Sequence, residues 1–134
     1  AEQYVAAGET CPRVDAIIRF NQILARVQLG QVAQAARQAP EVLRTMPSVA
    51  YLVVAAFALA AAREGRHADA ALMAGYCERV RQERDQWFDP AEAAAAAETA
   101  GLLARALPAD TLLDLLQMGA ALSLDAAWAM LSPD

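Results

Sequence analysis

The stretch VAYLVVAAFALAAA at residues 49–62 excludes many folds, because its one polar side-chain group is the hydroxyl of Tyr51. A helix that crosses a bilayer needs about 20 apolar residues, so this segment of 14 is too short. It lies in the middle of the chain, between Ser48 and Arg63, where a signal peptide does not occur. We therefore predict a helix that neighbouring helices cover on several sides.

Alanine accounts for 35 of the 134 residues, and all 11 basic residues are arginine. Alanine is the best helix former, and the alternating strands with turn dipeptides that a β-sheet requires are absent. A chain of this length can bury a core without disulfides or a metal. The composition predicts a single all-α domain over residues 1–134.

The sequence repeats itself at an offset of 35 residues. Residues 24–36 and 59–71 share one leucine, one glycine and four alanines in register. This period is close to the 34 residues of a tetratricopeptide repeat. Gly30 and Gly65 fall at equivalent positions, where a glycine in the left-handed conformation ends one helix and allows the next to begin at once. The alternative is a chance similarity within an alanine-rich chain.

The repeat predicts tetratricopeptide-like helical hairpins, an α-α superhelix with units at about 15–47 and 48–86, followed by a short C-terminal helical cap at 89–132. About seven helices are expected in total. Pro47 cannot continue the second helix, and Ser48 is the expected cap of the third. The expected helices of the two hairpins span 15–29, 31–46, 49–64 and 66–86, after a helical lead-in at 1–10.

The C-terminal helices have their own start and stop signals. Asp89 and Glu92 form a capping-box pattern, and the helix that they open is expected to run to about residue 107. Pro108 begins the next helix, Gly119 ends it, and Ser123 caps the last one. The side chains of the 108–119 helix expected to face the core are Leu112, Leu115, Leu116 and Met118.

Two segments resemble a known group of proteins. Residues 60–76, AAAREGRHADAALMAGY, resemble the last tetratricopeptide-like hairpin of large bacterial multidomain transcriptional regulators, and residues 106–127 resemble the ends of their chains. In those regulators a winged-helix or similar DNA-binding domain precedes an NTPase module and a long helical-repeat region. The resemblance covers roughly residues 50–131.

This resemblance implies the C-terminal helical-repeat domain of a cytoplasmic regulator, part of a longer chain. The implied role is a non-enzymatic scaffold or sensor that contacts protein partners, either upstream domains of its own chain or another subunit. A free-standing helical protein that binds a small hydrophobic ligand or a partner helix is the alternative.

The sequence offers little for catalysis, cofactors or metals. A phosphate-binding loop needs a lysine, and the chain has none. His67 is the only histidine, and Cys11 and Cys77 are isolated thiols. Residues 1–67 hold seven arginines and five acids, and residues 68–134 hold four arginines and eleven acids, without a basic cluster. We expect no enzyme activity, cofactor, metal, membrane or nucleic acid partner for this domain alone.

Tetratricopeptide geometry places six partner-binding candidates on one apolar groove: Ile17, Phe20, Leu24, Leu52, Leu59 and Arg63. Contiguous apolar area of this kind is rarely left exposed. Three segments are candidates to cover this groove: the lead-in segment 1–14, the helices after Asp89, or a second copy of the chain. A homodimer is slightly favoured.

Two further features of the sequence have structural interpretations. Trp87 and Phe88 precede a helix cap, where they form either a hydrophobic staple or an exposed contact with another domain. Gly75 lies inside an expected helix, where glycine costs about 1 kcal/mol relative to alanine. A close helix crossing at Gly75 explains that residue without a ligand.

Overall fold

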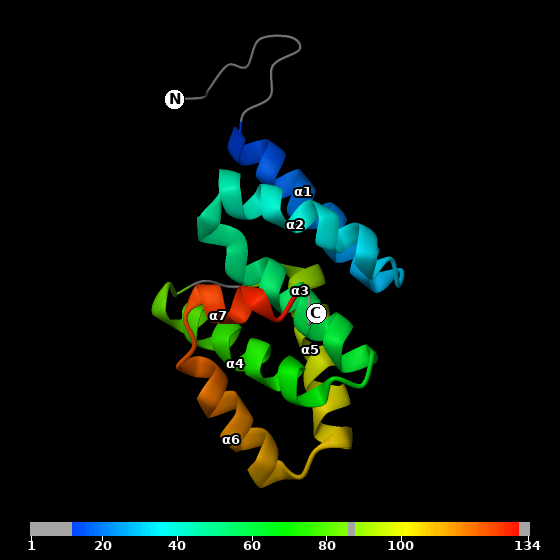
Figure 1. The fold of residues 1–134 in the computed structure, drawn as a ribbon, viewed down its shortest axis with the longest axis vertical. Coiled ribbons are helices and arrows are strands. Elements are labelled where there is room, and N and C mark those ends of the chain that lie inside the picture. The colour runs from blue at the N-terminus through cyan, green and yellow to red at the C-terminus, as the bar shows by residue number, and fades with distance from the viewer. Residues whose placement is uncertain (1–11, 86–87, 132–134) are drawn as a thin grey trace.

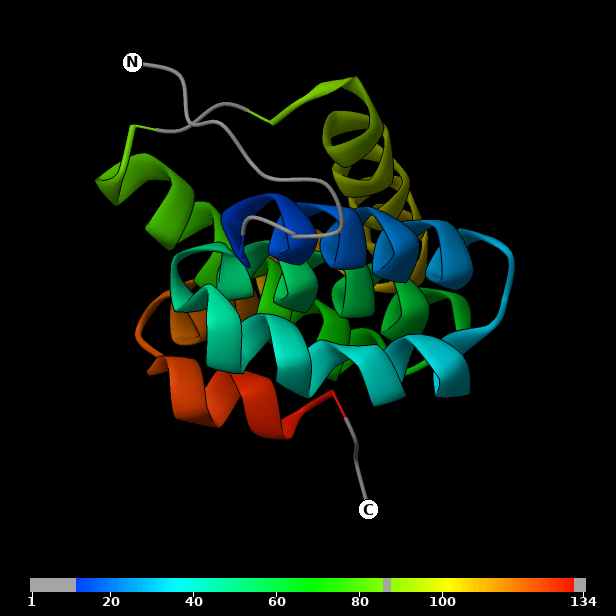
Figure 2. The same ribbon diagram turned by 90° about the horizontal axis from the view of Figure 1, so that it is seen from above.

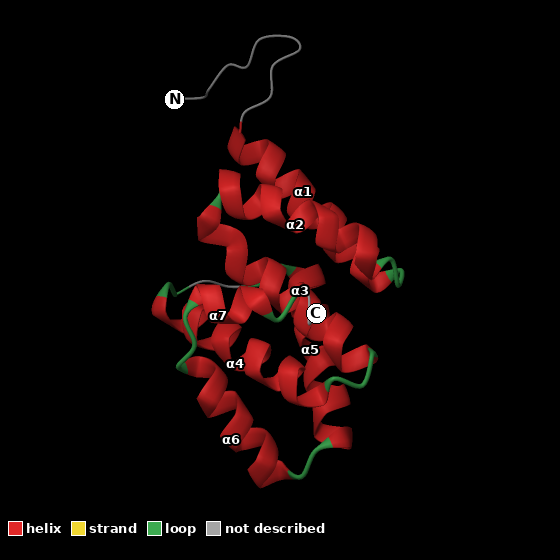
Figure 3. Cartoon of the chain, in the orientation of Figure 1, coloured by secondary structure: helices red, strands yellow, loops and turns green. Residues whose placement is uncertain are grey.

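The computed structural model describes residues 12–85 and 88–131, and this part of the chain is all-α (Figures 1 and 3). It contains seven α-helices, one short 3₁₀ turn and no strand. The expected lead-in at 1–10, Cys11 and Trp87 lie outside the described residues. The helices are α1 (Pro12–Gln28), α2 (Val32–Thr45), α3 (Ala50–Arg63), α4 (His67–Glu83), α5 (Pro90–Ala106), α6 (Ala109–Ala120) and α7 (Leu124–Ala129), with the 3₁₀ turn η1 (Pro47–Val49) before α3.

Helix α3 is the apolar segment of the sequence, and it forms the centre of the molecule. Eleven of its 14 residues are buried. It packs against α1, α2, α4, α5 and α7, and Figure 2 shows the antiparallel pair α1 and α2 running alongside it. The prediction of a helix covered on several sides is confirmed. Its burial requires neighbours on nearly every side, so it determines where the other helices lie.

The turns that end α1 and α3 have the same structure. In the first, Gly30 has a φ of +82°, and its N–H donates to Val27 O while Gln31 N–H donates to Arg26 O. This pair of bonds is a Schellman motif, which needs a residue in the left-handed conformation. The same pair of bonds recurs 35 residues later around Gly65, whose φ is +87°. The prediction that both glycines lie in inter-helix turns is confirmed.

Side-chain caps begin two of the C-terminal helices, as predicted. The Asp89 carboxylate accepts a hydrogen bond from Glu92 N–H at 2.8 Å, and the Glu92 carboxylate accepts one from Asp89 N–H at 3.0 Å. Ser123 Oγ accepts a hydrogen bond from Ala126 N–H at 3.1 Å. Each cap satisfies backbone donors that the first helical turn leaves unpaired.

Two predictions about individual side chains are wrong. Ser48 does not cap α3, because Pro47 starts the 3₁₀ turn η1 and the helix begins only after Val49. Met118 does not face the core, since 59% of it is exposed. Successive helical residues are about 100° apart, so Met118 points away from the face of α6 that Leu115 and Leu116 present to the core.

Arginine side chains connect the ends of helices to distant parts of the chain. Backbone carbonyls at helix ends lack intrahelical donors, and a guanidinium can supply them. Four arginines of the second hairpin donate in this way. The pairs are Arg63 with Val27 O and Gln28 O, Arg66 with Met130 O, Arg79 with Leu122 O, and Arg84 with Ser48 O.

Helices α4 and α6 cross with their backbones in direct contact (Figure 1). A Cβ built on Gly75 would lie 2.1 Å from Leu116 O, and one built on Gly119 would lie 2.0 Å from Leu72 O. The predicted close crossing at Gly75 is therefore confirmed. The prediction that Gly119 ends its helix is wrong, because α6 continues to Ala120 and Gly119 is buried in the crossing.

Gly75→Ala and Gly119→Ala should each lower the free energy of unfolding by about 1–3 kcal/mol, because the added methyl group forces the two backbones apart. Urea unfolding measures the loss. Gly101→Ala on α5 is the matched control, since its added Cβ meets only the side chain of Arg105 at 3.5 Å. That control should gain up to about 1 kcal/mol from helix propensity. Equal stability of all three variants would contradict the crossing.

Candidate functional site

The inner face of α1 and α3 holds most of the sequence-predicted partner-binding residues, and the chain itself covers it. Phe20 and Leu24 on α1 are 4% and 6% exposed, and Leu59 on α3 is fully buried. Leu52 is half-buried. Ile17 is 40% exposed and stays at the surface.

The cover of this face is helix α5. A small hollow between the helices is lined by Phe20 and Leu24 from α1, by Leu52 from α3, and by Glu92 and Ala95 from α5. The sequence left open which of three segments covers this face. In the structure it is covered by a helix after Asp89. The inner face therefore already holds a helix of the same chain.

Arg63 fixes α5 against the first hairpin. Its Nε and Nη2 donate to the two carboxylate oxygens of Glu98 at 2.8 and 2.9 Å. Its Nη1 donates to Val27 O at 3.2 Å and to Gln28 O at 3.1 Å, at the end of α1. A planar guanidinium can make all these bonds at once, whereas a lysine ammonium cannot. The predicted partner-binding arginine on α3 thus binds two other elements of its own fold, α1 and α5.

The ion pair between Arg63 and Glu98 shifts the pKa of both side chains. The hydrogen bonds from Arg63 lower the pKa of the Glu98 carboxyl, and the Glu98 carboxylate raises the pKa of Arg63. Because the pKa of Glu98 is lower in the folded state than in the unfolded chain, the pair stabilises the fold at neutral pH. That contribution is present above the unfolded pKa of about 4.3 and is lost as the pH falls through the folded-state pKa.

Glu98→Gln should therefore lower the free energy of unfolding at pH 7 by about 0.2–1 kcal/mol, the range for solvent-exposed ion pairs. Urea unfolding curves of the variant and the wild type should converge as the pH falls through the folded-state pKa of Glu98 and the wild-type carboxyl becomes protonated. Asp114→Asn is the control, because it removes an exposed carboxylate on α6 for which the structure gives no ion pair. A loss that persists unchanged at low pH would contradict the assignment.

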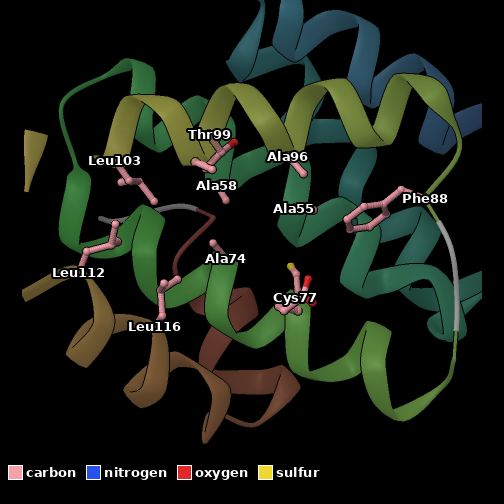
Figure 4. A pocket seen from close by; sticks show the side chains of 12 residues that line it. Ala55, Ala58, Ala74, Cys77, Phe88, Ala96, Thr99, Leu103, Leu112 and Leu116 are labelled. Atoms are coloured by element: carbon pink, nitrogen blue, oxygen red, sulfur yellow. The ribbon is translucent and has the colours of Figure 1, made fainter. Parts of the chain in front are cut away.

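A second feature lies beside this hollow, where α3, α4, α5 and α6 line a partly open apolar cavity of about 250 Å³ (Figure 4). Twelve residues line it. Five are alanines, from α3, α4 and α5, and four are the large apolar residues Phe88, Leu103, Leu112 and Leu116. The cavity exists because the alanine side chains are too short to fill the space between the helices.

The three other lining residues carry the polar groups. The Cys77 thiol donates to Tyr51 O at 3.1 Å, and burial raises the pKa of this thiol well above its ordinary value. The hydroxyl of buried Thr99 donates to Ala95 O at 2.9 Å. The Glu78 carboxylate accepts hydrogen bonds from Arg81 and Gln82, and the bond from Arg81 lowers the pKa of Glu78.

This arrangement suits binding more than catalysis. A nucleophilic cysteine must be a thiolate, and the Cys77 thiol is held neutral and hydrogen-bonded. Glu78 is an ionised carboxylate already paired with Arg81. The cavity therefore presents methyl groups and hydrocarbon chains, with one hydroxyl, one neutral thiol and the carboxylate that Arg81 binds among them.

The sequence reasoning missed this cavity. It assigned the apolar groove to α1 and α3, where side chains are large and easily recognised. The available signal was the alanine run at residues 93–97, of which Ala96 lines the cavity together with Ala74 and Cys77 on α4. Small residues on several helices permit either close approach or a void, and only the tertiary arrangement distinguishes the two.

Two other residues that the sequence analysis singled out, His67 and Phe88, are partly buried in the fold. His67 is the first residue of α4 and is half-buried. Phe88 packs against the core, and the Arg81 guanidinium lies 5.7 Å from the centre of its ring. This placement agrees with the structural interpretation of Phe88, although it also lines the cavity.

Comparison with known proteins found no matching family model, no similar curated protein and no similar solved structure. Across residues 12–85 and 88–131, the helices are all too short or too polar to cross a membrane. Within the same residues, no group of three or more histidine, cysteine, aspartate or glutamate side chains is placed to hold a metal ion.

Proposed function

We propose that the chain is a non-enzymatic protein-interaction module, built from two tetratricopeptide-like hairpins and a C-terminal helical cap. The observation that carries the proposal is the Schellman turn that recurs at an offset of 35 residues, around Gly30 and Gly65. Repeats of this kind use their inner face to hold helices or extended peptides. Here α5 lies on that face and is fixed by the Arg63–Glu98 pair.

The surface proposed for the partner is the free end of the first hairpin. Five large apolar side chains are exposed among the described residues, and three of them, Ile17, Ile18 and Leu29, lie on α1 or in the turn that follows it. Each helical repeat normally packs against the repeat before it. The partner is accordingly a helical surface, either upstream repeats of the same protein or a second copy of this chain.

The resemblance of residues 60–76 and 106–127 to bacterial multidomain transcriptional regulators supplies the biological setting. In that setting the module is the C-terminal helical-repeat domain, which transmits or maintains an inhibitory contact with an NTPase module. The parent gene gives a direct test. A reading frame that extends upstream into a nucleotide-binding loop supports this setting, whereas a reading frame limited to this chain contradicts it.

The chain should self-associate when no upstream repeat covers its first hairpin. Sedimentation velocity at about 100 µM should show a dimer, since exposed apolar area of this kind drives association. The double variant Ile17→Glu/Ile18→Glu should be monomeric with an unchanged melting temperature, because both side chains are already exposed. Leu113→Glu, at an exposed position of α6, should remain dimeric.

Phe20→Glu distinguishes the surface from the core beneath it. Phe20 is 4% exposed, so a buried charge at this position should unfold the protein. A wild-type chain that stays monomeric, or a double variant that remains dimeric, would contradict the proposed partner surface.

A further inference from the structure

We propose that the cavity between α3, α4, α5 and α6 is a binding site for a small, neutral, largely apolar ligand with one or two rings. The ligand needs no charged group of its own, and the site needs no metal to bind it. The site lies farther along α5 than the small hollow at the inner face of the hairpins, with which it shares Ala55 and Phe88. The inference goes beyond the interaction function proposed above and does not depend on it.

The size of the cavity sets the size of the ligand. An apolar cavity of roughly 150 Å³ stays dry and binds benzene in a well-packed helical protein. The cavity here measures about 250 Å³, which scales to a ligand of about ten non-hydrogen atoms. A helix of a partner protein is far too large for this space, and a single water has few polar groups to bind.

The polar groups of the lining exclude a charged ligand. Cys77 is neutral, and its S–H is already donated to Tyr51 O. The Glu78 carboxylate binds Arg81 and Gln82. An anion placed among the alanine and leucine side chains would lose its hydration and lie near the Glu78 carboxylate, and the pairing of that carboxylate with Arg81 weakens its attraction for a cation. A neutral apolar molecule loses little on entering the same space and gains contacts with the lining.

One group gives the site a polar preference. The Thr99 hydroxyl donates its proton to Ala95 O at 2.9 Å. It therefore has no proton left for a ligand, but its oxygen keeps a lone pair that can accept a hydrogen bond. Thr99 is 4% exposed, and Figure 4 shows its side chain beside Ala96 and Ala58 at the cavity. A ligand that carries one N–H or O–H group on an apolar ring fits this lining better than a pure hydrocarbon.

Indole is a suitable probe, because it is neutral, has nine non-hydrogen atoms and carries one N–H donor. Calorimetric titration of the whole chain should give one site with a dissociation constant of about 10 µM to 1 mM, the range open to ligands of this size. The melting temperature should rise with indole concentration, since indole binds the folded state. Indole-2-carboxylate should bind at least about tenfold more weakly because its charge loses hydration.

Ala96→Leu tests the location of the site. Ala96 is half-buried on α5 and lines the cavity, so the larger side chain should fill it and weaken indole binding by about tenfold or more. Ala97→Leu is the matched control on the same helix, where the side chain is exposed and is not part of the lining. It should bind indole as the wild type does. Ala100 lines the cavity at its exposed rim. Ala100→Leu therefore fills the cavity from that side and replaces Ala96→Leu in the test if Ala96→Leu does not fold.

Amide chemical shifts of the wild-type chain provide an independent measurement. Addition of indole should move signals of Ala74, Ala96 and Leu103, which line the cavity, and leave those of α2 unchanged. The proposal is overturned if indole shows no saturable binding up to a few millimolar. It is also overturned if Ala96→Leu and Ala100→Leu bind indole as tightly as Ala97→Leu, or if the shifted signals lie outside the cavity.

Discussion

Burial of α3 on nearly every side is the constraint on which the structure depends. A helix without a polar face can exist in water only inside a shell of other helices. Each large apolar side chain that becomes fully buried contributes about 1.5–3 kcal/mol, and α3 buries Val53, Val54, Phe57 and Leu59. The helices α1, α4, α5 and α7 supply the shell, while α2 and α6 pack chiefly on the helices of that shell.

Small residues have opposite consequences at two places in this shell. At the α4–α6 crossing, Gly75 and Gly119 bring two backbones into contact, since any Cβ would lie within about 2 Å of a carbonyl oxygen. Where α5 diverges from α4, alanines leave space that their side chains cannot fill. The same composition therefore produces a direct contact between two helix backbones at one place and an apolar cavity at another. Helix α5 joins this cavity to the inner face of the hairpins.

The features that the sequence predicted correctly depend on local physical chemistry. The length of the apolar run identified α3 as a buried helix. Gly30 and Gly65 marked two turns that need positive φ, and Asp89 with Glu92 marked a capping box. Each of these signals is a short pattern whose structural requirement holds in any protein.

The features that were missed depend on tertiary packing. Gly119 has the residue type of a helix stop, yet its place is set by Leu72 of α4. Arg63 resembled a partner-binding residue, but its partners, Glu98 and the end of α1, lie about 35 residues away in either direction along the chain. Which helix would cover the inner face was left open, because an apolar surface does not specify the surface that buries it.

Amide hydrogen exchange of α3 tests the central role of this helix most directly. If α3 is the centre of the shell, its interior amides from Val54 to Leu59 exchange only through global unfolding. Their exchange free energies should then equal the free energy of unfolding from urea denaturation. The amides of the six-residue edge helix α7 should exchange faster, through local opening. Amides of α3 that exchange as fast as those of α7 would contradict this account.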